Sequence, residues 1–423
     1  MDLIHRLNQH HPKVIDLTLG RINRLLELMG NPQNSLPPVI HIAGTNGKGS
    51  TLAFMRAIAE AAGLKVHVYT SPHLVKFNER IRINGEIITD QWLLELMNEV
   101  ESINGDAPIT FFEITTAIAL MAFSRSPGDL VLLETGLGGR LDATNVIARP
   151  TVTALTPISH DHADFLGNDI EKIAREKAGI IKQGIACVTA KQQPLALGVI
   201  RKIAENMGAP ISIQDKDWWV AIKGKKLSIM SPEGEINPPL PNLIGPHQIQ
   251  NAGLAIVTLA GLGDKRINRQ AVATGIKSAD WRARMQRLTQ GPLCGQLPMG
   301  WELWLDGGHN PAAGEAIAAT LRNLSDDPIH LIVGLINTKS PAEFLAPLRP
   351  HSKSLTSIKI PGSDSSFTAD EILISANKIG FQAKKTESIE RAIKDIVSSE
   401  RSPSKILICG SLYLAGNILK QNK

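Results

Sequence analysis

The sequence predicts an α/β fold: a larger N-terminal domain built on a doubly wound, mostly parallel sheet, followed by a smaller α/β domain. Short β-rich runs alternate along the chain with segments of helical length and periodicity. A glycine-rich turn joins the first run to the next helix, and the alternation restarts after Gly291–Gly300. Alternation of this kind indicates parallel strands, because each crossover helix returns the chain to the same edge of the sheet. A chain of 423 residues is also too long for one ordinary domain.

The N-terminal part opens with a predicted helix and a β-loop-α-β unit. Apolar residues recur at helical spacing over residues 14–28, and Gly30-Asn31-Pro32 ends the pattern. The same patterns predict strands at 39–43, 65–69, 130–133, 152–155 and 185–189, and helices at 52–62, 113–123, 170–178 and 248–262. These elements together make the doubly wound domain.

A small β insertion interrupts this rhythm. Two β-like runs within Trp218–Met230 flank Lys223-Gly224-Lys225, which is typical of a hairpin. Gly291–Gly300 contains glycines and prolines and no charge, and it is the best candidate for a linker. Beyond it the sequence predicts strands at 303–306, 330–333, 355–360 and 406–408, with a helix after Pro311.

Composition excludes several classes of protein. The net charge of +5 is spread over the chain and aromatic residues make up only 4%, so a nucleic-acid partner is not expected. A solvated basic surface explains the charge, and attraction of small anionic substrates is the alternative. Cys187, Cys294 and Cys409 form no CxxC pair, which argues against disulfides or a zinc knuckle. Without a signal peptide or a membrane-length apolar run, a cytoplasmic protein is expected.

The first strand runs directly into a phosphate-loop motif. Glycines let successive backbone N–H groups face an anion, and the following helix adds its dipole. A lysine in this loop can reach the terminal phosphates, and a hydroxyl can reach their magnesium ion. The spacing differs from the common G-x-x-x-x-G-K-[ST] loop, but an ordinary glycine turn with an exposed lysine is the weaker alternative. The motif consists of Gly44, Thr45, Asn46, Gly47, Lys48, Gly49 and Ser50.

Two further segments at strand ends suggest metal binding. Glu134 closes the strand at 130–133, and carboxylates at this edge of a parallel sheet are placed to meet a ligand. The segment 160–164 holds two histidines and two aspartates at the end of the next strand, which fits a metal site or a solvated turn. Spacing alone gives Lys177 no role beyond that of a solvent-facing helix lysine.

Taken together, the motifs resemble the folylpolyglutamate synthase and dihydrofolate synthase family, a branch of the Mur ligases. The matching segments occur in family order at 44–50, 70–74, 78–81, 112–113, 134–145, 161–162, 175–180, 247–252, 281–284 and 306–311. The stretches at 136–145 and 175–180 are particular to the folate branch. The resemblance implies a Mur-type ATP- and pterin-binding domain at 1–284 and a Rossmann-like glutamate-ligase domain at 285–423.

The resemblance also implies a role for each matching residue. The residues expected to bind ATP are Gly44, Thr45, Asn46, Gly47, Lys48, Gly49, Ser50, Asn251, Arg284 and Asp306. Of these, Arg284 and Asp306 are expected to reach the site from the interdomain region. Ser71, Glu134, His162 and Lys177 are expected to ligate two magnesium ions, with Lys177 in carbamylated form. The catalytic residues are Lys48, Lys177, Arg284 and His309. The pterin-binding residues are Leu17, Arg21, Thr110, Phe111, Phe112, Glu113, Leu141, Asp142 and Ala143.

The implied reaction is ATP-dependent ligation of L-glutamate to dihydropteroate and to the γ-carboxylate of folates, through an acyl phosphate. The expected partners are these small molecules, with no nucleic acid or membrane, and the enzyme is expected to be a monomer. A monofunctional folylpolyglutamate synthase, a cell-wall Mur ligase and a small-molecule kinase are the alternatives. A kinase would release ADP without glutamate. A catalytically dead nucleotide-binding module is disfavoured because Lys48, Glu134, His162, Lys177, Arg284 and Asp306 occur together.

Overall fold

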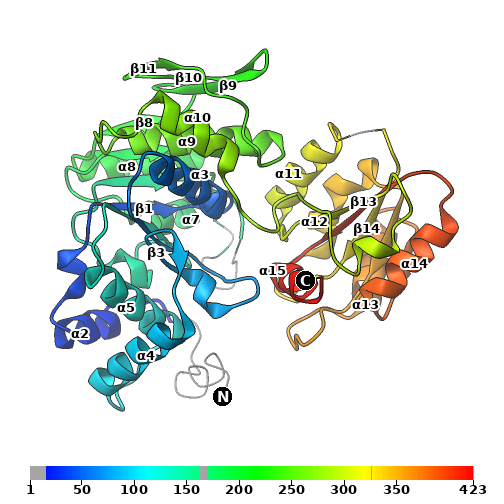
Figure 1. The fold of residues 1–423 in the computed structure, drawn as a ribbon, viewed down its shortest axis with the longest axis horizontal. Helices are drawn as coiled ribbons and strands as arrows, with labels where there is room; N and C mark the ends of the chain where they lie inside the picture. The colour runs from blue at the N-terminus through cyan, green and yellow to red at the C-terminus, as the bar shows by residue number, and fades with distance from the viewer. Residues whose placement is uncertain (1–15, 162–166, 168, 325, 423) are drawn as a thin grey trace. The chain divides into compact units, whose positions relative to one another are not determined.

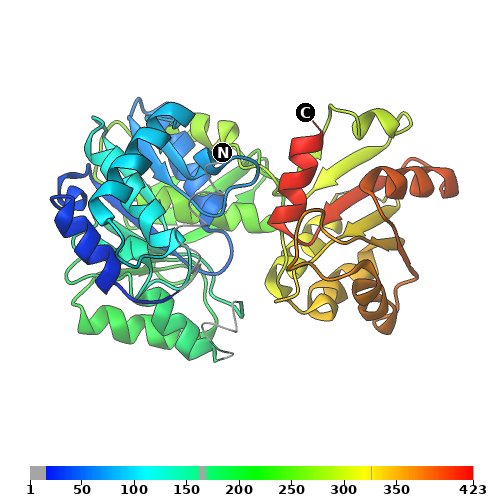
Figure 2. The same ribbon diagram turned by 90° about the horizontal axis from the view of Figure 1, so that it is seen from below.

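The structure is a computed structural model that describes residues 16–161, 167, 169–324 and 326–422. The chain forms two compact units. The first runs up to Ser159, resumes through Asn242 and includes Ile249–Asp280. The second contains Leu243–Gln248 and the chain from Trp281 onward, together with the segment that holds His160 and Asp161. Figures 1 and 2 show each unit as an open sheet flanked by helices.

The first unit is built on an eight-stranded sheet with the order β4-β3-β2-β5-β1-β6-β7-β8. The six neighbouring strands β2, β5, β1, β6, β7 and β8 are parallel. Strands β3 and β4 pair antiparallel at the edge next to β2. The strands are β1 (Val39–Ala43), β2 (Val66–Tyr69), β3 (Ile81–Ile83), β4 (Glu86–Ile87), β5 (Leu130–Glu134), β6 (Val152–Leu155), β7 (Cys187–Thr189) and β8 (Ile211–Ile213).

The helices of the first unit surround this sheet. They are α2 (Gly20–Leu28), α3 (Lys48–Ala61), α4 (Asp90–Asn104), α5 (Phe111–Ser124), α7 (Ile170–Ala178), α8 (Pro194–Asn206), α9 (Pro246–Ala260, in this unit from Ile249 on) and α10 (Arg269–Ser278). Short 3-10 turns are η1 (Pro32–Ser35), η2 (Phe77–Arg80) and η3 (Ala143–Val146). One buried cluster joins α2, α4 and α5 to the sheet through Val39, Val131 and Leu133. No helix among the described residues is long and apolar enough to cross a membrane.

The expected elements of this unit are confirmed, with shifts at their ends. Helix α3 begins at Lys48 rather than residue 52, because Gly47 (φ 93°) caps the helix directly after the glycine turn. Helix α2 begins at Gly20, whereas the periodic pattern placed its start at residue 14. The predicted insertion is a three-stranded antiparallel sheet of β9 (Trp219–Lys223), β10 (Lys226–Ser231) and β11 (Gly234–Ile236). It packs on α9 where Gly253 leaves room for Val220.

The second unit has a six-stranded sheet with the order β12-β13-β17-β14-β15-β16, in which only the β12–β13 pair is antiparallel. The strands are β12 (Gln286–Leu288), β13 (Glu302–Leu305), β14 (Ile329–Val333), β15 (Ser354–Ser357), β16 (Ala383–Lys385) and β17 (Lys405–Cys409). The helices are α11 (Pro311–Leu321), α12 (Pro341–Leu345), α13 (Ala369–Lys378), α14 (Ile389–Ser399) and α15 (Leu412–Gln421), with turns η4 (Cys294–Gln296) and η5 (Ala346–His351).

The prediction that Gly291–Gly300 is a linker is wrong. Strand β12 precedes this stretch and already pairs with β13, so the stretch is a connection within the second unit. Asn422 holds its first turn by accepting from Leu293 N at 2.9 Å and donating to Gln290 O at 2.7 Å. Glycine and proline therefore mark a tight, ordered turn here.

Candidate functional site

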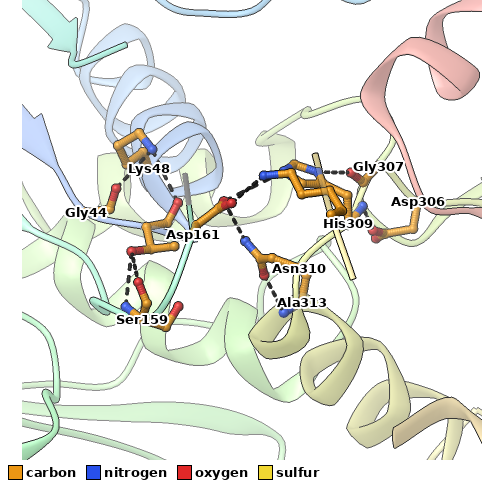
Figure 3. Close-up of polar contacts among 12 residues, drawn as sticks. Gly44, Lys48, Ser159, Asp161, Asp306, Gly307, His309, Asn310 and Ala313 are labelled. Carbon is orange, nitrogen blue, oxygen red and sulfur yellow. Dashed lines mark hydrogen bonds and ion pairs between the residues drawn. The ribbon is translucent and has the colours of Figure 1, made fainter. Parts of the chain in front are cut away.

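The phosphate loop lies between β1 and α3, where the sequence predicted it. Lys48 Nζ donates to Gly44 O at 3.1 Å and to Thr45 O at 3.3 Å, so the ammonium group is folded back over the loop (Figure 3). Thr45 Oγ1 donates to Ser159 O and accepts from Ser159 N, both at 3.0 Å. These contacts fix the loop to the end of β6 and leave the first turn of α3 as the anion-facing end of a helix.

Gly47 brings the predicted nucleotide residue Asn251 against this loop. Gly47 has a φ of 93°, and a Cβ atom built on it would lie 2.5 Å from Asn251 Oδ1. Both the backbone conformation and the close approach therefore require glycine.

We expect Gly47→Ala to weaken magnesium-ATP binding by about 10- to 100-fold, because the methyl group adds backbone strain and displaces Asn251. Gly63 is the matched control: its φ is 79°, and a Cβ atom added to it would have nothing within 4 Å. Gly63→Ala should lower the melting temperature without changing nucleotide affinity. Calorimetric titration of both variants with ATP measures the difference, and equal affinities in the two variants would contradict the proposed contact.

Ser71 and Glu134 meet at the carboxyl ends of β2 and β5. These strands are neighbours in the sheet, and Ser71 N donates to Glu134 Oε2 at 3.3 Å. Glu134 is only 4% exposed. A hydroxyl and a carboxylate oxygen are hard donors that suit magnesium, so these two side chains fit the metal that the resemblance implies. His162, the third expected ligand, lies outside the described residues.

Lys177 is buried, so the expectation from spacing that it faces solvent is wrong. It lies in the last turn of α7 with 4% of its surface exposed. Its Nζ donates to Gly44 O at 3.0 Å, the same carbonyl that accepts from Lys48. Two lysines from different helices thus converge on the first residue of the phosphate loop.

The two segments most typical of the folate branch contact each other. Arg140 N donates to Glu176 O at 2.7 Å, and the Arg140 guanidinium pairs with the Glu176 carboxylate at 2.8 Å. A Cβ at Gly139 would lie 2.8 Å from the carbonyls of Glu176 and Lys177. The loop after β5 and the end of α7 therefore pack backbone to backbone, and this contact holds Lys177 in place.

The predicted pterin residues of the first helices lie around Glu113. Thr110 and Glu113 form a capping box at the start of α5, and Arg21 Nε donates to Glu113 Oε2 at 2.9 Å. Glu113 is 2% exposed, and its Oε1 has no hydrogen-bond partner among the described residues. Leu17, in contrast, packs on the cluster around α7 and α8.

Phe111 lies in the hydrophobic core, whereas Phe112 contacts the loop after β5. Phe111 is buried in the cluster around α5, and Phe112 packs on that cluster with its ring 6.1 Å from that of Tyr69. A Cβ at Gly136 would lie 2.4 Å from the Phe112 ring, so α5 closely contacts the loop after β5.

All hydrogen-bond acceptor positions of the Asp142 carboxylate are occupied by donors of its own loop. Oδ2 accepts from Gly136 N at 2.9 Å and Leu137 N at 2.8 Å, and Oδ1 accepts from the backbone N and the hydroxyl of Thr144. Two oxygens offer about four acceptor positions, and all four are occupied. Burial raises the pKa of Asp142, and these hydrogen bonds oppose the rise. Asp142 therefore shapes the loop, and contacts from Leu141–Ala143 to a ligand would come from other atoms. Leu141 is partly exposed, whereas Ala143 is buried.

Three predicted residues lie in the second unit. Asp306 follows β13, is 4% exposed, and accepts from Met285 N at 2.8 Å and Gly308 N at 2.6 Å. Burial raises its pKa, and the nearby charge of Arg284 opposes the rise. His309 Nδ1 lies 2.9 Å from Gly307 O, and burial lowers its pKa against the effect of Asp161.

Sequence reasoning missed Lys339 and did not anticipate the contacts of Asp161. Within the second unit, Asp161 accepts from Asn310 Nδ2 at 2.9 Å and from Lys339 Nζ, and His309 Nε2 lies 3.8 Å from it (Figure 3). No group of three or more metal-binding side chains occurs in the part of the chain that the structure describes. The contacts given above for Asp161 are with a lysine, an amide and a histidine, and residues 162–164 of the same segment lie outside the described residues. Lys339 carries no motif, and the sequence offers no signal for this contact.

Comparisons with known proteins match both parts of the chain. The Mur ligase middle domain family matches residues 42–259, and the family described as dihydrofolate synthetase, C-terminal domain, matches residues 298–421. The dihydrofolate synthase/folylpolyglutamate synthase of Bacillus subtilis is 36% identical and covers 96% of this chain and 95% of its own. The protein of the same name from Escherichia coli is 31% identical, with coverages of 98% and 93%.

Solved structures show the same fold over nearly the whole chain. E. coli FolC in complex with DHPP and ADP has a TM-score of 0.89 at 31% identity, covering 99% of this chain and 96% of its own. A bifunctional folylpolyglutamate synthase/dihydrofolate synthase with Mn, AMPPNP and L-glutamate bound has a TM-score of 0.86 at 28% identity, with coverages of 99% and 96%.

Proposed function

Because the chain belongs to the dihydrofolate synthase/folylpolyglutamate synthase family of the Mur ligases, we propose that it joins L-glutamate both to dihydropteroate and to the γ-carboxylate of folates. It is an ATP-dependent acid–amino-acid ligase. The observation that carries the proposal is the convergence of the phosphate loop, the Ser71–Glu134 pair and the buried Lys177 at one edge of the sheet.

The proposed reaction has two steps. The γ-phosphoryl group of ATP passes to the acceptor carboxylate, which gives an acyl phosphate and ADP. The amine of glutamate then attacks the acyl carbon, phosphate leaves, and an amide forms with loss of a proton. The first step is needed because a carboxylate anion is a poor electrophile. Positioning and neutralisation of charge are the protein's main contributions to phosphoryl transfer.

Each side chain has a role that follows from its position. The backbone N–H groups of the loop and the start of α3 bind the phosphates, and Lys48 exchanges its two carbonyl partners for stronger anionic acceptors. Asn251 lies against the loop at Gly47 and contacts the nucleotide. Nucleotide contacts are also assigned to Arg284 and Asp306, and catalytic roles to Arg284 and His309. Asp306 and His309 belong to the C-terminal domain, which we assign to residues 285–423, and Arg284 directly precedes it.

Magnesium binding is assigned to Ser71, Glu134 and His162, together with Lys177 in carbamylated form. Bound magnesium would neutralise charge on the phosphates. A lysine amine is not a ligand for magnesium, whereas a carbamate ends in two oxygens and would be one. The burial of Lys177 beside the phosphate loop supports this assignment.

The pterin site is assigned to the N-terminal part, residues 1–284, around Arg21, Glu113 and the loop at Leu141–Ala143. The pairing of Arg21 with Glu113 supports a shared site for the segments that carry them. We further propose that the enzyme acts as a monomer on small molecules.

The test is glutamate-dependent phosphate release, measured separately with dihydropteroate and with tetrahydrofolate. We expect release with both acceptors, and none without glutamate beyond slow hydrolysis. Release with tetrahydrofolate alone would make the enzyme a monofunctional folylpolyglutamate synthase. A stable phosphorylated product formed without glutamate would indicate a kinase, and release with neither acceptor would reject the folate assignment.

A further inference from the structure

Three buried polar side chains connect the strand before the phosphate loop to the loop that carries Leu141–Ala143. His41 and Thr144 have no exposed surface, and Asp142 is 2% exposed. His41 Nε2 lies 2.8 Å from Thr144 Oγ1, and the Thr144 hydroxyl donates to Asp142 Oδ1. The proposed chemistry uses neither His41 nor Thr144, so this line of contacts needs an explanation of its own.

The donors and acceptors in this line follow from the saturated carboxylate. Four donors face the two oxygens of Asp142, so the Thr144 proton points toward Oδ1. Thr144 Oγ1 is then an acceptor for His41, which places the ring proton on Nε2. Burial lowers the pKa of His41 to about 3, with the charge of Lys182 acting in the same direction. The ring is therefore a neutral donor throughout the physiological pH range.

Packing alone does not account for a histidine at position 41. Its Nδ1 atom is buried and has no hydrogen-bond partner in the described part of the chain. A buried acceptor without a partner destabilises the fold, and an apolar side chain on this core strand would avoid that cost. The hydrogen bond from Nε2 to Thr144 is thus the feature that distinguishes histidine from an apolar residue here.

We propose that His41 is a positioning residue: through Thr144 and Asp142 it fixes the loop at 136–144 relative to the phosphate loop. His41 lies on β1, three residues before Gly44. At the other end of this line of contacts, Asp142 accepts from the backbone N–H groups of Gly136 and Leu137. The acceptor and the γ-phosphate of ATP must meet within reacting distance, and one strand would then set the position of both binding loops. This inference rests on the proposed function and adds a determinant of acceptor binding to it.

The test compares Thr144→Val, which removes the hydroxyl at nearly constant volume, with Thr144→Ser, which keeps it. We expect Thr144→Val to raise the KM for dihydropteroate about tenfold, the effect of one buried hydrogen bond, and to leave the dissociation constant for magnesium-ATP unchanged. Thr144→Ser should restore most of the acceptor affinity. His41→Leu should behave as Thr144→Val does, and His41→Gln, with an amide N–H near the position of Nε2, should recover part of the loss.

The outcomes separate this inference from the function on which it rests. A wild-type enzyme without acceptor-dependent phosphate release overturns both. An active wild type with an unchanged KM in Thr144→Val and His41→Leu overturns the positioning role alone. Equal losses in Thr144→Val and Thr144→Ser, or a parallel loss of ATP affinity, also overturn it, because they point to packing rather than to the hydrogen bond. Should Thr144→Val fail to fold, the pair His41→Leu and His41→Gln decides the question by the same comparison.

Discussion

Replacing Lys48 with methionine is expected to lower kcat about 10²- to 10³-fold, which is the usual effect of removing one preorganised donor from a charge-stabilising site. The ammonium group is the charged side chain of the phosphate loop, and it is held there by Gly44 O and Thr45 O. Methionine keeps the length of the side chain and removes its charge. The loss should therefore appear in phosphoryl transfer, while the fold is retained.

Single-turnover measurement of ADP formation with saturating acceptor would locate this loss in the first chemical step. Lys202→Ala is a suitable control, because Lys202 is an exposed lysine on α8 in the same unit. We expect wild-type rates for the control. A Lys48→Met enzyme that forms ADP at the wild-type rate would remove the phosphate loop from the mechanism.

The sequence predicted the central strands well, because a fully buried parallel strand is a continuous apolar run. Strand β1 has the bounds that were expected, and so does helix α7, whose start is marked by the capping residue Asp169. The start of α3 was missed because its first turn contains Gly49 and follows Gly47, and glycine is not typical of a helix. Gly291–Gly300 was misassigned because composition does not tell a linker from an ordered turn, and only the contacts of Asn422 distinguish them.

The candidate site was predicted where it depends on a local motif and missed where it depends on distant contacts. The phosphate loop and Glu134 are local signals at strand ends, so their positions followed from the pattern. Lys339 reaches Asp161 across 178 positions of sequence, and no periodicity encodes that contact. The saturation of Asp142 depends on how its own loop folds back, so its role in shaping the loop could not be inferred from residue type.

Replacing Lys177 tests the carbamate directly, because the variants separate charge from modification. We expect Lys177→Ala to lower turnover at least about 100-fold, as loss of a metal-positioning group does. Lys177→Arg should be equally impaired, since it keeps a cation near Gly44 O but cannot form a carbamate. Lys172→Ala is the control on the same helix, where the side chain is exposed.

The proposed carbamate on Lys177 can be detected by NMR spectroscopy. In the proposed modification, the neutral amine of Lys177 would attack carbon dioxide, form a new N–C bond and release a proton, so the product would be an N-carboxylate. Wild-type protein equilibrated with 13C-bicarbonate should show a carbamate resonance that is absent in Lys177→Arg. Removing bicarbonate should lower the activity of the wild type, and a small carboxylate such as acetate should partly restore Lys177→Ala by supplying oxygens in the vacated space. Full activity of Lys177→Arg without bicarbonate would show that the lysine acts through its contact with Gly44 O as a cation, and the carbamate would have to be abandoned.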